Sequence, residues 1–223
     1  MGRDDWYRST HWDSETEAAF RAKLARSRTS RPQYLRIQAS YLAGNFPKAA
    51  LRLIDEYFET GDEFDVPNAL CARAEASLAL GERGEAVSAY KQALEWEEAH
   101  PRHISTARVD LPKLVALDRL ANEYDYALDI LTTRFTPMDH QFPSTRYTWN
   151  GSCALIMHEQ GQLVEARELA ERALRAAMET ESPFRYHRTV GVVRGTSDDF
   201  GQRIKRIAQP PKVRSLLRLL LGK

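Results

Sequence analysis

Residues 72–101 read ARAEASLALGERGEAVSAYKQALEWEEAHP, and this stretch decides the fold. Apolar residues recur at helical spacing on both sides of Gly81, and Pro101 follows the second run. Because glycine adopts a left-handed backbone conformation without strain, Gly81 is the expected end of one helix and the start of a tight turn. The stretch therefore predicts a helical hairpin, with helices over residues 67–80 and 83–99.

The same pattern occurs four times along the chain. In each copy a turn residue is followed five positions later by a small alanine, and successive turn residues lie 37, 41 and 39 positions apart. One helical hairpin cannot bury its apolar face until a neighbour covers it, so a period of this length is typical of stacked hairpins. The four pairs of turn residue and alanine are Gly44 with Ala49, Gly81 with Ala86, Asn122 with Ala127, and Gly161 with Ala166.

Helix starts are marked by capping residues and by prolines that suit the first turn of a helix. Ser14 and Ser30 each open a capping box, and Pro47, Pro67 and Pro112 each follow a capping residue by two positions. The predicted helices are 14–26, and then the pairs 31–43 with 46–59, 67–80 with 83–99, 110–121 with 124–134, and 144–160 with 163–180.

Residues 72–101 resemble the tetratricopeptide repeat (TPR) family, from the first helix of the repeat to its closing proline. The fourth copy, EQGQLVEARELAERAL at residues 159–174, is similar to that repeat too, while the first and third copies diverge more. The resemblance covers residues 31–180, and it is to TPR proteins of bacterial type. It implies an all-α, tetratricopeptide-like solenoid of about four repeats with N- and C-terminal capping helices. Three segments are expected along the chain: an aromatic segment with a capping helix at residues 1–30, the repeat array at 31–180, and a C-terminal extension at 181–223.

In TPR arrays, the first helix of each pair forms most of a concave binding surface. Carrying its inward-facing positions over residue by residue gives a mixture of aromatic, amide and charged side chains. Such a mixture suits an extended peptide or a protein segment, although solvated helix residues are the ordinary alternative. The implied partner-binding residues are Arg31, Tyr34, Gln38, Tyr41, Asn68, Glu75, Arg119, Thr148 and His158.

The two ends of the chain depart from the repeat. The first thirteen residues hold Trp6, Tyr7 and Trp12 among charged residues, a composition too aromatic for a disordered leader. We expect them to cap the first hydrophobic face of the array, with a partner-anchoring role as the alternative. After the fourth pair, Thr189 to Val193 is expected to be extended, and Asp198 and its neighbours are expected to cap a short helix that ends near Ala208.

The last residues, KVRSLLRLLL at 212–221, predict a basic amphipathic helix. Three interpretations are open: a lid on the last repeat, a helix that binds a partner or a second copy of the chain, and a contact with anionic lipid or nucleic acid. The third is the weakest, because ten residues bury little area and no aromatic platform accompanies the cations. The possible tail interface is Arg214, Leu216, Leu217, Arg218 and Leu220.

Composition excludes several broad classes of function. The chain of 223 residues carries 32 basic and 31 acidic residues, so no overall field attracts nucleic acid or a membrane surface. Seven basic residues and no acidic one fall between Gly201 and Lys223, which leaves 25 basic and 31 acidic residues in the rest. No run approaches the length of a membrane span, and no signal peptide opens the sequence. Cys71 and Cys153 are expected to be reduced core thiols, and the expected location is cytoplasmic.

Catalytic motifs are missing from the sequence: there is no phosphate loop, nucleophile elbow, metalloprotease motif or paired cysteine motif. His100 and His103 form a close histidine pair, but two histidines in a polar loop are ordinarily solvated. We therefore expect an adaptor that binds a protein or peptide partner, with no enzyme activity, cofactor or metal, and a homo-oligomer through the C-terminal helix remains open. The alternatives are a dedicated immunity or accessory subunit for one partner, and an enzyme with a polar cavity near Arg146, His158 and Glu159.

Overall fold

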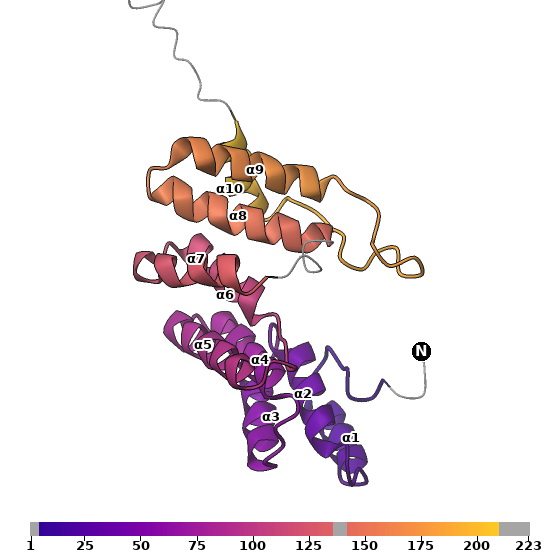
Figure 1. Cartoon of the computed structure of the whole chain (residues 1–223). Helices are drawn as coiled ribbons and strands as arrows, with labels where there is room; N and C mark the ends of the chain where they lie inside the picture. Colours follow the sequence, from indigo (N-terminus) through magenta and orange to yellow (C-terminus); the bar gives the residue numbers. More distant parts are fainter. Residues whose placement is uncertain (1–4, 136–141, 210–223) are drawn as a thin grey trace, which may run out of the picture. The chain divides into compact units, whose positions relative to one another are not determined.

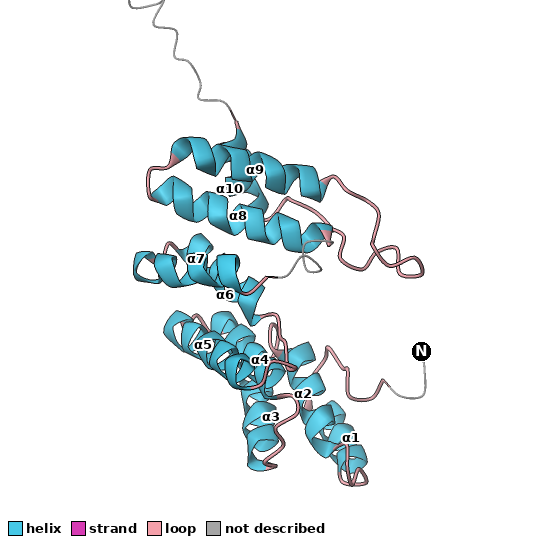
Figure 2. Cartoon of the chain, viewed as in Figure 1, coloured by secondary structure: helices cyan, strands magenta, loops and turns pink. Residues whose placement is uncertain are grey.

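The computed structural model describes residues 5–135 and 142–209 (Figures 1 and 2). These residues form ten α-helices and one short 3-10 helix, and they contain no strand, so the all-α prediction is confirmed. The chain divides into two compact units, residues 1–111 and 112–223, and α6 runs across the division. No helix within the described ranges is both long enough and apolar enough to cross a membrane.

The first unit is built from consecutive helices that pack in pairs. Helix α2 packs against α3, α4 packs against α5, and α3 and α4 also touch. The core of this unit contains fully buried leucine and aromatic side chains, among them Leu35, Leu53 and Tyr57. The helices are α1 (Ser14–Leu24), α2 (Arg31–Leu42), α3 (Pro47–Glu59), α4 (Val66–Ala79), α5 (Arg83–Ala99) and the start of α6 (Ala107–Asp118).

The second unit contains a long hairpin covered by a short helix. Helices α8 and α9 pack along each other, and α10 packs against both (Figure 1). The elements after α6 are η1 (Ala121–Glu123), α7 (Tyr124–Thr133), α8 (Pro143–Glu159), α9 (Leu163–Ala177) and α10 (Asp199–Ala208). The predicted tail helix, with Arg214, Leu216, Leu217, Arg218 and Leu220, lies outside the described residues.

The alanine that follows each turn is buried in all four copies. Ala86, Ala127 and Ala166 have no exposed surface, and Ala49 is 7% exposed. A side chain of one methyl group at this position lets the second helix of a hairpin come close to the first. All four alanines therefore lie in the core, where a small side chain suits a close contact between helices.

Two of the four predicted turn residues have the left-handed conformation, and Gly44 lies in its turn without it. Gly81 and Gly161 have φ of 80° and 82° and end their helices as expected, but Gly44 is not in the left-handed region. In the third copy the left-handed residue is Arg119, with φ of 54°, and not Asn122. Helix α6 therefore begins and ends about three residues before its predicted bounds, and Pro112 lies inside it instead of in its first turn.

Helix α1 is capped one residue earlier than the sequence predicts. The Asp13 carboxylate accepts a hydrogen bond from the backbone N–H of Thr16 at 2.8 Å, so Asp13 is the N-cap and Ser14 is the first helical residue. Hydrogen bonds from the Thr16 backbone and side chain, followed by one from His11, hold the pKa of Asp13 well below its usual value. Glu17 does not close a capping box; instead its carboxylate accepts from the Trp12 indole N–H at 3.1 Å.

Glycine at position 151 allows α10 to approach α8 closely. A methyl group added at Gly151 would lie 2.5 Å from the Ile204 Cδ1 atom and 2.7 Å from the Phe200 Cζ atom. Both of these side chains are almost completely buried, so neither has room to move aside. The short helix predicted to end near Ala208 is confirmed, and its N-cap is Asp198, whose carboxylate accepts from the Gly201 N–H at 2.9 Å.

We predict that Gly151→Ala destabilises the second unit by about 1–3 kcal/mol, because the added methyl group overpacks the contact between α8 and α10. Urea denaturation followed by circular dichroism measures this change. Gly84→Ala is the matched control, since a methyl group there meets nothing within 4 Å. Equal stability of the two variants would contradict the close approach of α10 to α8.

Candidate functional site

The N-terminal segment covers part of the predicted binding face in the first unit. The Ser9 backbone N–H donates to Gln38 Oε1 at 3.1 Å, and Gln38 Nε2 donates to the Ser9 carbonyl at 2.7 Å. The rings of Trp6 and Tyr7 lie 4.8 Å and 4.5 Å from that of Tyr34. Gln38 has no exposed surface, so its amide holds the chain's own segment and is not open to a partner.

The other predicted residues of the first unit are more accessible. Arg31 and Glu75 are exposed, and Tyr41 is 45% exposed. Asn68 is half-buried and donates to Asp65 Oδ1 at 3.2 Å. The open part of this face therefore consists of one aromatic and two charged side chains.

Burial raises the pKa of several ionisable groups in the first unit. Burial raises the pKa of the Cys71 thiol to about 11, and its Sγ donates to Ser105 Oγ at 3.3 Å. Ser105 in turn donates from its hydroxyl to Glu97 Oε1 at 2.6 Å. Although much of the Glu75 residue is exposed, partial burial of its carboxyl group, followed by the nearby Asp110 charge, raises its pKa. Cys71, Ser105 and Glu97 form a hydrogen-bonded network in the core, and burial in a packed core is an ordinary cause of a raised thiol pKa.

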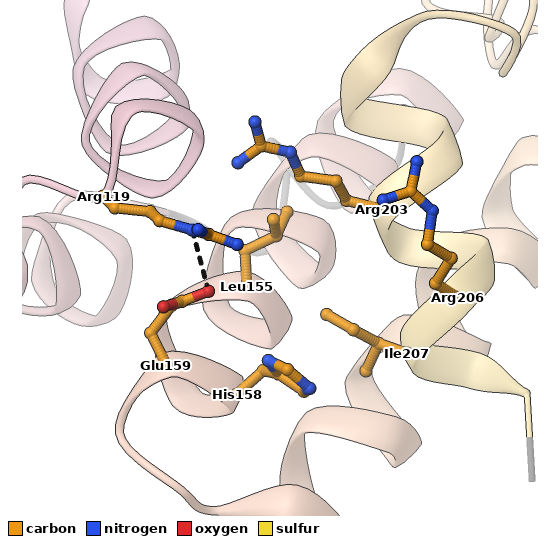
Figure 3. A pocket seen from close by; sticks show the side chains of 7 residues that line it. All are labelled: Arg119, Leu155, His158, Glu159, Arg203, Arg206 and Ile207. Atoms are coloured by element: carbon orange, nitrogen blue, oxygen red, sulfur yellow. Dashed lines mark ion pairs between the residues drawn. The ribbon is translucent and has the colours of Figure 1, made fainter. Parts of the chain in front are cut away.

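The second unit contains a small pocket of about 140 Å³ (Figure 3). Its walls come from the end of α8, from α10 and from the turn after α6. We call it the basic pocket, because three of its seven lining residues are arginines and one is a glutamate. The lining residues are Arg119, Leu155, His158, Glu159, Arg203, Arg206 and Ile207.

Arg119 reaches the basic pocket from a strained turn. The Leu120 N–H donates to the Val115 carbonyl at 3.0 Å, which is the six-to-one hydrogen bond of a Schellman helix end. In this motif the residue before Leu120 takes a left-handed conformation, which is free for glycine but costs other residues about 1–2 kcal/mol. Gly81 and Gly161 fill the same position in their turns, so arginine at position 119 carries a strain that those turns avoid.

The guanidinium of Arg119 is held by an acidic residue of α8. Its Nε atom lies 3.0 Å from Glu159 Oε1, as the dashed line in Figure 3 marks. Tyr124 of α7 is close to this pair: burial raises the pKa of its hydroxyl, and the Glu159 charge adds to the increase. The pair therefore fixes the turn after α6 against the C-terminal end of α8.

Arg203 of α10 is held by one hydrogen bond and one ion pair. Its Nη1 atom donates to the Leu117 carbonyl at 2.7 Å, and its Nη2 atom lies 2.8 Å from Asp199 Oδ2. The first contact satisfies a carbonyl in the last turn of α6, where helices favour cations. Arg206 follows three residues later and is exposed. Figure 3 shows both arginines on α10, opposite Arg119.

The basic pocket joins two of the predicted binding residues. Arg119 and His158 come from different helical hairpins and line it together, whereas Thr148 is half-buried on α8 and does not line it. Arg146, suggested for a polar cavity, pairs instead with Glu179 at 2.5 Å.

The prediction missed Arg203 and Arg206 as site residues. In the sequence, these two arginines stand out only as members of the basic C-terminal stretch. Their spacing of three residues, opposite the buried pair Phe200 and Ile204, was the available signal that they share the free face of one helix.

Comparison of the chain with protein-family models, with curated proteins and with solved structures finds no match. Within the described ranges, no group of three or more histidine, cysteine, aspartate or glutamate side chains is arranged to hold a metal ion. His100 stacks on Trp96 with a centroid distance of 4.3 Å, and His103 Nδ1 lies 2.7 Å from the Phe64 carbonyl. Both histidines are therefore accounted for by contacts within the first unit.

We predict that Arg119→Gly is about 1 kcal/mol more stable than Arg119→Ala, since only glycine relieves the left-handed strain at this turn. Both variants lose the ion pair with Glu159, so their difference isolates the backbone term. Urea denaturation of the two variants measures it. If they unfold at the same urea concentration, residue 119 is not left-handed in solution.

We predict that the free energy of unfolding falls as the pH rises from about 9 to about 11, because the buried Cys71 thiol has a raised pKa. The thiol stays neutral in the folded state up to its raised pKa, whereas the unfolded chain gains stability from ionisation above the ordinary pKa. Burial of the neutral thiol thus contributes its full stabilisation below pH 9. Roughly 2–3 kcal/mol of that stabilisation is lost by pH 11. Denaturation in reducing buffer should show a smaller loss for Cys71→Ala, and equal losses would contradict the shift.

Proposed function

We propose that this chain is a tetratricopeptide-like adaptor that binds a protein partner, with an acidic group of the partner in the basic pocket. The observation that carries the proposal is the convergence of Arg119 and His158, two predicted binding-face residues from separate hairpins, on one pocket. Three packed pairs of consecutive helices, α2 with α3, α4 with α5 and α8 with α9, and a buried alanine after each of the four turns support the tetratricopeptide-like part of the proposal. Arg203 and Arg206 add the positive charge that an acidic group requires.

The size of the basic pocket favours one end of a large ligand over a whole small molecule. Pockets that enclose drug-sized ligands have volumes of about 300–1,000 Å³, and this one has about 140 Å³. The Arg119 side chain is 63% exposed, so much of it remains available beside the pocket for contact with a larger surface. Leu155 and Ile207 supply apolar area next to the charges, a mixture typical of protein interfaces.

The experiment places a photo-crosslinking amino acid at His158, which is exposed at the pocket, and irradiates cells of the native host. The partner recovered at this position is purified, and its affinity is measured for the parent protein and for two charge-reversal variants. We predict that Arg206→Glu weakens binding by at least about tenfold, because it replaces an attraction by a repulsion at the interface.

Arg172→Glu is the matched control. Arg172 is exposed on α9 at 57%, pairs within its own helix with Glu168 at 3.8 Å, and does not line the pocket. Its reversal should leave the affinity within about twofold. A partner that binds all three proteins equally would contradict the role of the basic pocket, and the absence of any partner crosslinked at position 158 would contradict the adaptor function.

A further inference from the structure

The basic pocket already contains one carboxylate. Glu159 occupies the Nε side of Arg119, so an incoming acidic group must compete with a charge that the protein supplies itself. A carboxylate that binds beside Glu159 gains little, since Glu159 repels it and already neutralises part of the arginine charge. A ligand with two negative charges gains more from the same three guanidinium groups.

The number of donors in the basic pocket also exceeds what a carboxylate can accept. Each guanidinium has five N–H donors, and one fork is enough for both oxygens of a carboxylate. Arg119 uses one nitrogen for Glu159, and Arg203 uses two for Leu117 and Asp199. Counting contacts among the described residues, donors remain on all three arginines, and they approach from the turn after α6 and from α10 (Figure 3). A phosphoryl group presents three oxygens in a tetrahedral arrangement, which suits donors from several directions.

We infer, taking the proposed function as given, that the basic pocket binds a phosphomonoester dianion carried on a side chain of the partner. Arg206 and the free fork of Arg119 hold its oxygens, and Arg203 adds charge from the position fixed by Leu117 and Asp199. Glu159 acts as an internal competitor that lowers the affinity of every anion, so only a ligand that gains strongly from the three guanidinium groups binds well. The pocket thereby selects a phosphorylated segment over an ordinary acidic one.

The inference is tested on the full chain with two small probes of equal ring size, phenyl phosphate and benzoate. Binding is followed by NMR of the arginine Nε–H groups at constant ionic strength and at pH 7.5. Phenyl phosphate is expected to bind about tenfold more tightly than benzoate. Arg206→Gln should weaken phenyl phosphate binding by about tenfold, while Arg172→Gln should change it by less than about twofold.

Glu159→Gln gives a result that a merely structural role of Glu159 would not produce. Removal of its charge should increase the affinity for both probes, and for phenyl phosphate at least as much as for benzoate, because a like charge repels a dianion more strongly than a monoanion. The resonance of Arg119 should shift in this variant even without a probe, because its ion pair is lost. An affinity for either probe that does not rise in this variant would overturn the competitor role.

The outcomes separate this inference from the proposed function. Equal binding of phenyl phosphate and benzoate would overturn the phosphoryl inference, while a crosslinked partner lost in Arg206→Glu would still support the adaptor. Phosphatase treatment of that partner should abolish its binding, and retained binding would show that its phosphate is not the ligand. Binding of phenyl phosphate with no partner crosslinked at position 158 would overturn the partner-borne source and favour a free phosphomonoester.

Discussion

The close contact of α10 with α8 at Gly151 is the constraint on which the candidate site depends. Phe200 and Ile204 are buried there, and burial of each such side chain contributes roughly 1.5–3 kcal/mol. With these two residues turned inward, helical spacing leaves Arg203 and Arg206 on the free face of α10, where they meet the end of α8. A short helix of ten residues would be marginal alone, so its docking, and not its propensity, places two of the three arginines.

The third arginine reaches the basic pocket by a different route. Arg119 stands where Gly81 and Gly161 stand in their own turns, and a glycine there would fold at least as well. The strain at position 119 is offset partly by the ion pair with Glu159 and partly by Arg203, which bonds a carbonyl of the same helix end. Backbone strain retained at a position lined by charged side chains is typical of functional sites, so it is independent support for a ligand at this pocket.

Sequence periodicity predicted most of the fold because the hairpins obey local rules. Helix bounds in the first, second and fourth pairs agree with the structure to within about three residues, since glycine and proline mark their ends. In the third pair the first helix lies three residues before its predicted bounds, because Asn122 satisfies the usual rule for a left-handed residue and Arg119 does not, whereas the second helix agrees to within one residue. The hydrogen bond from Leu120 to Val115 also occurs in the glycine turns, and the ion pair of Arg119 with Glu159 joins residues too far apart in the sequence to be read from local rules.

The candidate site was harder to predict than the fold because it combines segments that the repeat pattern treats separately. Arg119 and His158 stand at inward-facing positions that the TPR resemblance implies, but Arg203 and Arg206 lie beyond the repeats, where the resemblance implies no positions. Conversely, Tyr34 and Gln38 have the chemistry of a peptide-binding face, and the chain's own segment takes up that chemistry through Ser9, Trp6 and Tyr7. Because Gln38 both donates to and accepts from the Ser9 backbone, the amide that sequence chemistry assigns to a partner is already satisfied within the chain.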